Sequence, residues 1–248
     1  MYYRCNICGA LNETAPENFG RETPDCAGCG STLRMRAVIG LLGRHLFGSA
    51  LAIGDFPRRR DLRGVGLSDW DEYASRLATR LSYTNTYYHE EPRLDITDVP
   101  DHLAGKHDFV ISTDVFEHVA PPVHRAFEGA KRLLKPGGVL ILTVPYVLET
   151  CETSEHFPEL HDWTLETGGP SGWRLVNITR SGERQQFDDL VFHGGPGTTL
   201  EMRVFAKEAL LRSLSQAGFK GVRVADEPIP EIGVVWPVLW TLPVVAYA

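Results

Sequence analysis

The feature of this sequence that most restricts its fold is an alternation of short apolar runs with amphipathic helical segments. Residues 109–112 and 139–144 are apolar runs of strand length, and the helical pattern 124–134 lies between them. That pattern ends at the turn signal Lys-Pro-Gly-Gly of residues 135–138. Parallel neighbouring strands need a crossover of a dozen residues or more, and this crossover is usually a helix. Two strands that are joined through a helix are therefore expected to be parallel. We therefore predict an α/β fold with a Rossmann-like, doubly wound, mostly parallel sheet.

The other elements follow from the same periodicities. Apolar residues three and four positions apart predict helices, whereas short apolar or β-branched runs predict strands. The helices are expected at residues 32–47, 68–81 and 207–217, and the strands at 51–57, 82–88, 93–96, 202–205 and 222–224. The final apolar run, residues 232–248, is expected to form the last strand or a packed tail.

Four of the five cysteines fall into two Cys-x-x-Cys pairs near the N-terminus. Two such turns supply four thiolates in a tetrahedron, which suits zinc and leaves no coordination position open for a substrate. Free structural cysteines and a redox pair are the alternatives, but a redox motif has no need of a second pair. We predict a structural Zn²⁺ ion in a zinc ribbon of residues 1–32, followed by a main domain of residues 33–248. Its ligands would be Cys5, Cys8, Cys26 and Cys29.

Composition and charge narrow the class of protein. The chain has 248 residues, is 43% hydrophobic and carries a formal net charge of −7, which suits a soluble globular protein with a full-sized core. Residues 1–63 hold nine basic and six acidic side chains, a net charge of +3, so only this quarter offers a basic face and nucleic acid is not the expected partner. We expect no secretory or transit peptide at the start of the sequence, and Pro237 and Pro243 interrupt its longest apolar segment. We expect no membrane span and a cytoplasmic protein.

Residues 146–200 interrupt the alternation of strands and helices. This segment is rich in Gly, Pro, Trp and His, and residues 173–179 and 185–192 predict one hairpin. Because it lies between two elements of the sheet domain, we expect it to form an insertion that covers the substrate.

Two stretches of the sequence resemble a known family. Residues 108–119, DFVISTDVFEHV, and 133–141, LLKPGGVLI, resemble the fourth-strand and post-helix motifs of class I S-adenosylmethionine-dependent methyltransferases, in particular the type 11-like group. Residues 94–100 look like the third-strand motif of that family, and the cysteine pairs resemble a zinc-ribbon extension that some members carry. The resemblance covers about residues 50–146 and 202–226 and implies S-adenosylmethionine as the cofactor.

The resemblance also implies which residues contact the cofactor. The family's glycine-rich loop is altered here, and its role falls either to Gly54, within the predicted strand 51–57, or to Gly66, which follows the basic loop. The acid expected after the second strand has no obvious counterpart, and either Tyr87 or Glu90 would take its place. The predicted cofactor-binding residues are Gly54, Asp55, Gly66, Ser68, Tyr87, Asp95, Ile96, Asp114 and Val115.

Histidines are the candidate catalytic residues. Methyl transfer is an in-line displacement at a sulfonium, and a hydroxyl acceptor must lose its proton, a task that histidine performs near neutral pH. His118 follows the fourth predicted strand, while His156, His161 and His193 lie in the insertion. Each is also explained by a structural role, as a helix-capping or loop histidine.

The sequence therefore predicts an S-adenosylmethionine-dependent methyltransferase that acts on a small molecule or a glycan, at oxygen. An RNA-base methyltransferase is one alternative, against which the net charge stands. A non-catalytic relative that uses the old cofactor cleft for binding is the other, because the glycine-rich loop is altered. The sequence leaves the oligomeric state open.

Overall fold

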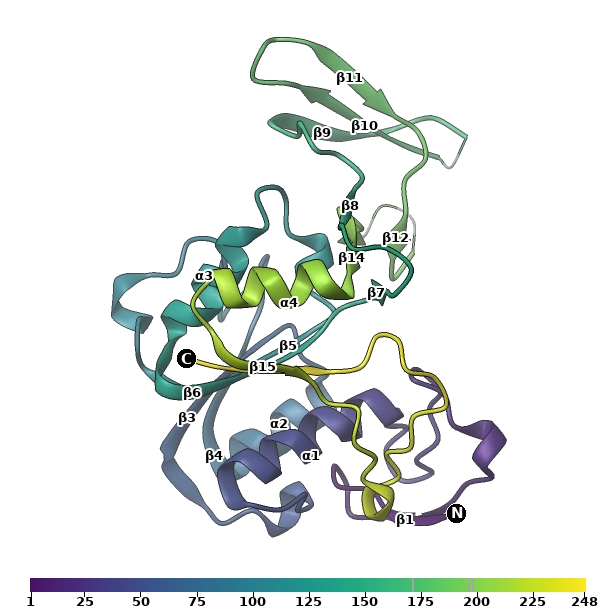
Figure 1. The fold of residues 1–248 in the computed structure, drawn as a ribbon, viewed down its shortest axis with the longest axis vertical. Coiled ribbons are helices and arrows are strands. Elements are labelled where there is room, and N and C mark those ends of the chain that lie inside the picture. Colours follow the sequence, from purple (N-terminus) through teal and green to yellow (C-terminus); the bar gives the residue numbers. More distant parts are fainter. Residues whose placement is uncertain (171, 196, 198) are drawn as a thin grey trace.

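The computed structural model describes residues 1–170, 172–195, 197 and 199–248. A six-stranded sheet runs through its centre in the order β15-β16-β6-β5-β3-β4 (Figure 1). Four neighbouring strands, from β6 to β4, are parallel, and β16 is antiparallel to both of its neighbours. The strands are β3 (Arg59–Leu67), β4 (Leu81–Thr86), β5 (His107–Thr113), β6 (Leu134–Thr143), β15 (Lys220–Val224) and β16 (Val244–Tyr247). The predicted fold class is confirmed, and the final apolar run does supply the last strand.

Helices cover both faces of this sheet. Helices α1 (Leu33–Phe47) and α2 (Asp71–Arg80) lie on one face, and α3 (His124–Leu133) and α4 (Lys207–Gln216) on the other (Figure 1). Alternate residues of β5 enter opposite cores: Phe109 and Ile111 join the cluster that includes α1 and α2, whereas Val110 joins the cluster that includes α3 and α4. The run from Phe109 to Ile111 is apolar at every position because both faces of β5 are buried there.

The first strand of the sheet differs from the prediction. Residues 51–57 form no strand, and Ile53–Asp55 is a 3-10 helix instead. The buried Ile53 donates its backbone N–H to Asn6 O at 2.8 Å, so these apolar residues pack against the ribbon and not in the sheet. The strand is β3, whose first half is the basic stretch that the sequence suggested as a loop.

The expected strand at residues 93–96 is also absent. Only an isolated bridge joins Arg93 to Tyr87, and the chain then turns at Asp95. The backbone N–H and the hydroxyl of Thr97 donate to Asp95 Oδ1 at 2.8 and 2.7 Å, which fixes this turn. Ile96 is buried beneath α3, where a Cβ on Gly129 would lie 1.8 Å from its carbonyl oxygen.

The N-terminal segment is bonded firmly to the sheet domain. It contains the strands β1 (Tyr2–Arg4) and β2 (Leu11–Glu13), and its buried residues join the same apolar cluster as α1. Arg36 of α1 is fully buried and pairs with Asp25 of the ribbon, with 2.8 Å from Nη2 to Oδ2. Its guanidinium also donates to the carbonyls of Ile232 and Gly233 at 2.9 and 3.0 Å. Buried contacts thus cross the domain boundary that we predicted at residue 32.

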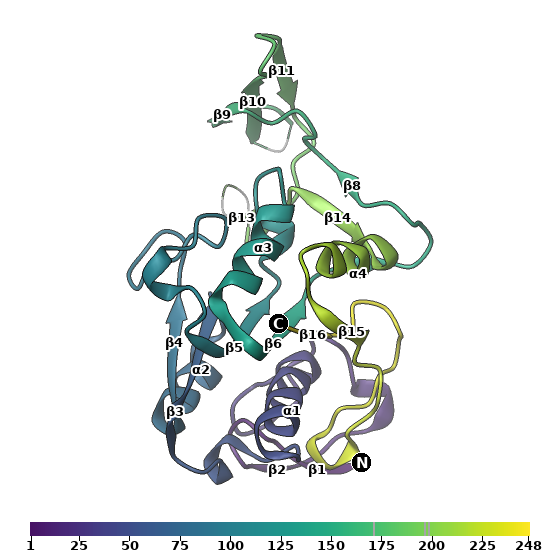
Figure 2. The ribbon, with the colours of Figure 1, turned by 60° about the vertical axis from the view of Figure 1, so that its left-hand side comes forward.

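The insertion divides into two parts. Its base contains residues 146–155 and the strands at 192–193 and 199–200, and its projecting sheet contains the strands between residues 162 and 187. The predicted hairpin is confirmed as β10 and β11, and β9 adds a third strand, so that the sheet β11-β10-β9 extends away from the body (Figures 1 and 2). The base lies beside the end of the central sheet. The strands from the insertion onward are β7 (Tyr146–Val147), β8 (Ser154–Glu155), β9 (Asp162–Thr167), β10 (Trp173–Ile178), β11 (Arg184–Phe187), β12 (Phe192–His193), β13 (Thr199–Leu200) and β14 (Arg203–Ala206). None of the helices in the described residues is long and apolar enough to cross a membrane.

Candidate active site at the carboxyl edge of the sheet

The parallel strands end together along one border of the sheet, which we call the carboxyl edge. Thr113 of β5 pairs with Thr143 of β6, and β3 ends beside β5 at Leu67. The residues that follow β3 and β5, Ser68 and Asp114, both have a φ of 53°, so the chain turns sharply away from the sheet at both points. Open α/β sheets bind their ligands at this edge.

A buried aspartate occupies the turn after β3. The side chain of Asp69 accepts hydrogen bonds from the hydroxyls of Tyr83 and Thr113, the latter at 3.2 Å. Its backbone N–H donates to Asn85 Oδ1 at 2.9 Å. Burial raises the pKa of Asp69 to about 7, although the hydrogen bonds from Tyr83 and Tyr73 oppose this shift.

The glycine before this turn makes room for that hydrogen bond. A Cβ on Gly66 would lie 1.9 Å from Tyr83 Oη and 2.3 Å from Asp69 Oδ2. The sequence assigned Gly66 to the close approach of a cofactor, but the space beside it is filled by the chain's own side chains. The structure therefore gives Gly66 a packing role.

The aspartate after β5 is held by the N-terminal segment. Arg21 of the ribbon donates to both carboxylate oxygens of Asp114, at 2.8 and 3.2 Å, and Arg34 Nε of α1 lies 3.3 Å from Oδ2. The hydroxyl of Thr143 donates to Oδ1 at 2.9 Å. Burial alone would raise the pKa of Asp114, but the guanidiniums of Arg34 and Arg21 outweigh burial and lower it. Asp114 is thus a fixed negative charge at the carboxyl edge.

The other predicted cofactor residues fall into two groups. Tyr87 lies where β4 ends and donates its hydroxyl hydrogen to Asp71 Oδ1 at 2.9 Å, while the half-buried Val115 follows Asp114. In contrast, Gly54 and Asp55 lie in the 3-10 helix against the ribbon. Because they do not follow a strand of the sheet, their assignment to the cofactor loop loses its structural basis.

Three histidines and a glutamate meet beside the turn after β5. Ring nitrogen Nε2 of His156 lies 2.9 Å from Glu201 Oε1, and Nε2 of His193 lies 3.0 Å from Glu201 Oε2. The ring of His118 lies edge-on to that of His193, with 4.7 Å between centroids, and its Nδ1 is 2.9 Å from the carbonyl oxygen of Leu200. Burial lowers the pKa of His118, which favours its neutral form. We call these four side chains the histidine cluster.

The segment between β13 and β14 builds this cluster. The backbone N–H of Met202 donates to Glu117 O at 2.8 Å, and Met202 O accepts from the N–H of His156 at 2.9 Å. The fully buried Arg203 donates to the carbonyls of Phe116 and Val119 at 2.8 and 2.6 Å. These bonds join the insertion to η4 (Phe116–His118), the 3-10 helix after β5.

Sequence reasoning grouped His161 with His118 and His156, but the structure separates it. His161 is exposed and lies at the start of β9, in the sheet that projects from the body (Figure 1). Its backbone N–H donates to Asn177 Oδ1 at 2.9 Å. The structure brings His193 to His118 instead.

Several site residues escaped the sequence analysis as functional candidates. The only local signal was their position next to residues that we did single out, as with the acid after Ser68 and the acid before His118. The others approach the site from distant parts of the chain. The residues are Arg21, Arg34, Asp69, Glu117 and Glu201.

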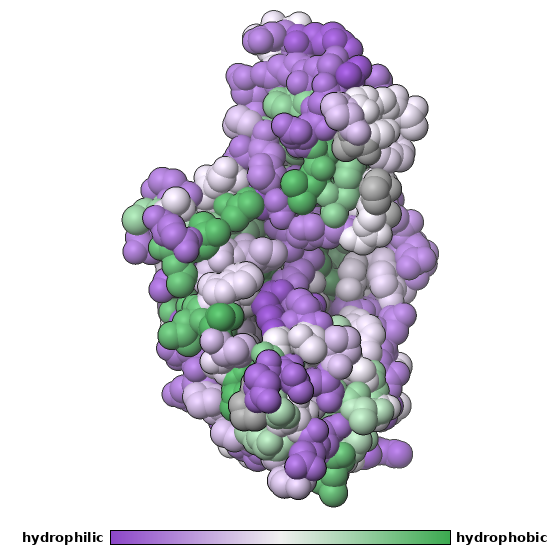
Figure 3. All heavy atoms as spheres, turned by 90° about the vertical axis from the view of Figure 1, so that its right-hand side faces the viewer, coloured by the Kyte–Doolittle hydropathy of each residue, from purple (hydrophilic) through white to green (hydrophobic). Residues whose placement is uncertain are grey.

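A hollow marks this part of the surface. Figure 3 shows the face on which the ribbon, the C-terminal loop and β7 lie, and it is recessed at mid-height between the insertion and the ribbon. Hydrophilic side chains line the recess. Since β7 directly follows the end of β6, the recess lies on the side to which the carboxyl edge opens.

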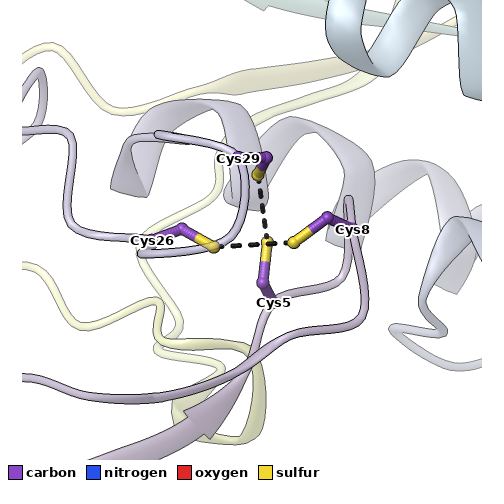
Figure 4. A group of neighbouring side chains, drawn as sticks. All are labelled: Cys5, Cys8, Cys26 and Cys29. Carbon is purple, nitrogen blue, oxygen red and sulfur yellow. Dashed lines mark hydrogen bonds between the residues drawn. The ribbon is translucent and has the colours of Figure 1, made fainter.

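The four ribbon cysteines converge on one point (Figure 4). The sulfur of Cys5 lies 3.8 Å from that of Cys29, and the sulfur of Cys8 lies 3.6 Å from that of Cys26. Four thiolates bound tetrahedrally to zinc at about 2.3 Å have their sulfurs about 3.8 Å apart. The spacing of the sulfurs therefore suits a zinc ion, and the four cysteines brought together are those named from the sequence.

Comparisons with known proteins give a family and a set of similar folds. Residues 52–224 match the family model described as a methyltransferase domain. The chain is similar to the S-adenosylmethionine dependent methyltransferase of Mesorhizobium loti, with 14% identity, a TM-score of 0.39, and coverage of 79% of this chain and 94% of that one. It is also similar to the 1,6-didemethyltoxoflavin-N1-methyltransferase of Burkholderia thailandensis, with 16% identity, a TM-score of 0.47, and coverage of 86% of this chain and 77% of that one. A third similar structure is an amino pentose methyltransferase of Micromonospora echinaspora, with 14% identity, a TM-score of 0.46, and coverage of 88% of this chain and 92% of that one. No curated protein matched the sequence.

The raised pKa of Asp69 predicts a pH-dependent stability. Its pKa is about 7 in the folded chain against 3.8 for an ordinary aspartate, so the folded chain holds a proton that the unfolded chain has released in between. Protonation of Asp69 in the folded chain adds to the free energy of unfolding. This contribution is fully present below about pH 4 and is lost as the pH rises through 7. Between pH 5 and pH 8 the wild type should lose on the order of 2 kcal/mol relative to Asp69→Asn, measured by urea unfolding.

The exposed Asp98 supplies the matched control for this measurement. Asp98→Asn removes a surface carboxylate and should follow the wild type at both pH values. Parallel pH dependence of the wild type and Asp69→Asn would contradict the assignment.

Proposed function

Because the chain belongs to the family of methyltransferase domains, we propose that it transfers the methyl group of S-adenosylmethionine to an oxygen atom of a small molecule or a glycan. The observation that carries the choice of oxygen is the histidine cluster beside Asp114, at the edge where such a sheet binds ligands. A hydroxyl acceptor needs a base within reach, and the cluster offers one. A cytoplasmic location belongs to the same proposal, since thiolate zinc ligands persist in a reducing compartment.

His156 is the base in this proposal. Its Nε2 lies 2.9 Å from Glu201 Oε1, which holds the Nε2–H tautomer and leaves Nδ1 to take the hydroxyl proton. S-adenosylmethionine supplies an electrophilic methyl group on a sulfonium. His156 would take the proton of the acceptor hydroxyl, so that the oxygen could accept this methyl group. His118 is the second candidate, because its Nδ1 is bonded to Leu200 O and its Nε2 carries the lone pair.

The carboxyl edge supplies the groups that would hold the cofactor. Arg21 and Arg34 keep Asp114 ionised and fix its position, so the turn after β5 is held in place at the edge where the cofactor would bind. Asp95 accepts from Thr97 through Oδ1 only, so among the described residues its Oδ2 is left for a donor such as the adenine amino group. Tyr87 and Ser68 flank the edge at the ends of β4 and β3.

One observation favours a second function. The space beside Gly66, where the family's loop admits the cofactor, is filled by Tyr83 and Asp69. A relative that no longer binds S-adenosylmethionine, and uses the recess for another ligand, would also have this feature.

The proposal is tested with methyl-labelled S-adenosylmethionine. The zinc-loaded chain is incubated with the labelled cofactor and with fractionated small molecules and glycans, and with RNA in parallel, and the labelled atom is identified by mass spectrometry. We expect label on an oxygen of a small molecule or glycan. Label on an RNA base, or no cofactor binding by calorimetry, would support one of the alternatives and contradict the proposal.

The catalytic role of His156 gives a specific outcome. His156→Ala should lower turnover of the labelled product by about 10²- to 10⁴-fold, the usual contribution of a general base, and leave cofactor affinity intact. The exposed His102 offers the matched control, and His102→Ala should behave as wild type. If His156→Ala instead lowers only the unfolding midpoint, this histidine is structural.

We also propose that the four cysteines hold one structural zinc ion. Elemental analysis after a brief wash with EDTA should find one zinc per chain in the wild type and none in Cys8→Ser, with a lower unfolding temperature in the variant. Cys151 is exposed and lies outside the cluster, so Cys151→Ser should keep the zinc. A zinc-free wild type of unchanged stability would contradict this part of the proposal.

A further inference from the structure

A second group of metal-binding side chains lies away from the cysteines. One ligand atom from each of Glu117, His118 and His193 lies within 4.8 Å of the others. Glu117 and His118 belong to η4 after β5, whereas His193 belongs to β12 of the insertion. The group therefore forms only where the insertion meets the carboxyl edge.

Among the described residues, the carboxylate of Glu117 has no hydrogen-bond partner. The side chain is 0% exposed, and neither carboxylate oxygen has a hydrogen-bond partner among the described residues. Its nearest basic group is His118, with 3.8 Å between Oε1 and Nε2, which is beyond hydrogen-bond range. A buried carboxylate without a partner is strongly destabilising when it is ionised, so a proton or a cation is needed to stabilise it.

The orientation of His118 favours a cation. Its Nδ1 lies 2.9 Å from Leu200 O, and because a carbonyl oxygen only accepts, Nδ1 carries the hydrogen. The lone pair is then on Nε2, the atom nearest to Glu117. Histidines that bind metal ions have this arrangement, with the second ring N–H donated to a carbonyl or a carboxylate.

A second carboxylate completes the surroundings. Oxygen Oε2 of Glu201 lies 3.0 Å from Nε2 of His193, and Glu201 is mostly buried. It orients the histidine that the insertion contributes and adds negative charge near the group. Arg203, the adjacent cation, is directed elsewhere: it bonds to Glu155 and to the carbonyls of Phe116 and Val119.

We propose that Glu117, His118 and His193 bind a divalent first-row transition-metal ion. Two imidazoles and one carboxylate suit Zn²⁺, Fe²⁺ or Mn²⁺, and the set contains no thiolate. Three protein ligands leave coordination positions open, which water or an oxygen of a bound acceptor can fill. The site would lie next to Asp114, at the edge where we propose methyl transfer. Its existence does not rest on that proposal, because metal binding is measured without the cofactor.

Cobalt binding tests the site. The full-length chain is first washed with EDTA and confirmed to hold zinc at the cysteines, and Co²⁺ is then added and followed by equilibrium dialysis and visible absorption. We expect one Co²⁺ per chain, with ligand-field bands but no thiolate-to-cobalt charge-transfer band. That spectrum separates binding by nitrogen and oxygen from exchange into the cysteine cluster.

Two variants and a control decide the outcome. Glu117→Gln keeps the shape of the side chain and removes its charge, and His193→Ala tests the insertion's ligand at a more exposed position. Each should lower the affinity for Co²⁺ at least tenfold, while His102→Ala should bind as wild type. Unsaturable binding at millimolar Co²⁺, or unchanged affinity in both variants, would overturn the proposal and show that Glu117 is instead a protonated buried acid.

Discussion

The contact on which the candidate site depends is the ion pair between Arg21 and Asp114. The arginine comes from the ribbon and the aspartate from the end of β5, 93 positions later in the sequence. Arg34 of α1 lies close to the same carboxylate, so the ribbon, α1 and the end of β5 are all in contact at Asp114. A partly buried ion pair is destabilising when one partner is lost, because the remaining charge is left without compensation. The ribbon and the carboxyl edge of the sheet must therefore form together, and the buried pair of Arg36 with Asp25 fixes the ribbon on the other side.

The insertion reaches the same edge from the opposite direction. Residues 200–203 bond to η4 and to the segment after β8, which brings three histidines and Glu201 together. The projecting sheet of β9 to β11 takes no part in these contacts. Two additions to a common α/β frame, the ribbon and the insertion, thus contribute Arg21, His156 and His193 to the site. This explains how a chain with an altered glycine-rich loop can still present a polar, well-ordered edge.

The sequence predicted those parts whose signals are local. The apolar runs of β5 and β6, the cysteine spacing and the family likeness at residues 108–119 depend on neighbouring residues, and the structure and the family match confirm the fold and the family. The first strand was misplaced because β3 begins with exposed, basic residues, whereas the apolar Ile53 packs against the ribbon. The histidine cluster could not be predicted, because contacts such as that of His118 with Leu200 span 82 positions. His161 resembled its neighbours in the sequence, but β9 begins there and leads away from the site.

We propose that the ribbon is part of the methyl-transfer site and not a separate module. Calorimetric titration of S-adenosylmethionine into the zinc-loaded chain tests it most directly, with Arg21→Ala compared with Arg4→Ala. Arg4 also belongs to the ribbon but pairs with the exposed Asp55, away from the carboxyl edge. We expect saturable binding by the wild type and by Arg4→Ala, and at least tenfold weaker binding by Arg21→Ala, since Asp114 loses its main partner. Equal affinity of all three proteins would contradict it.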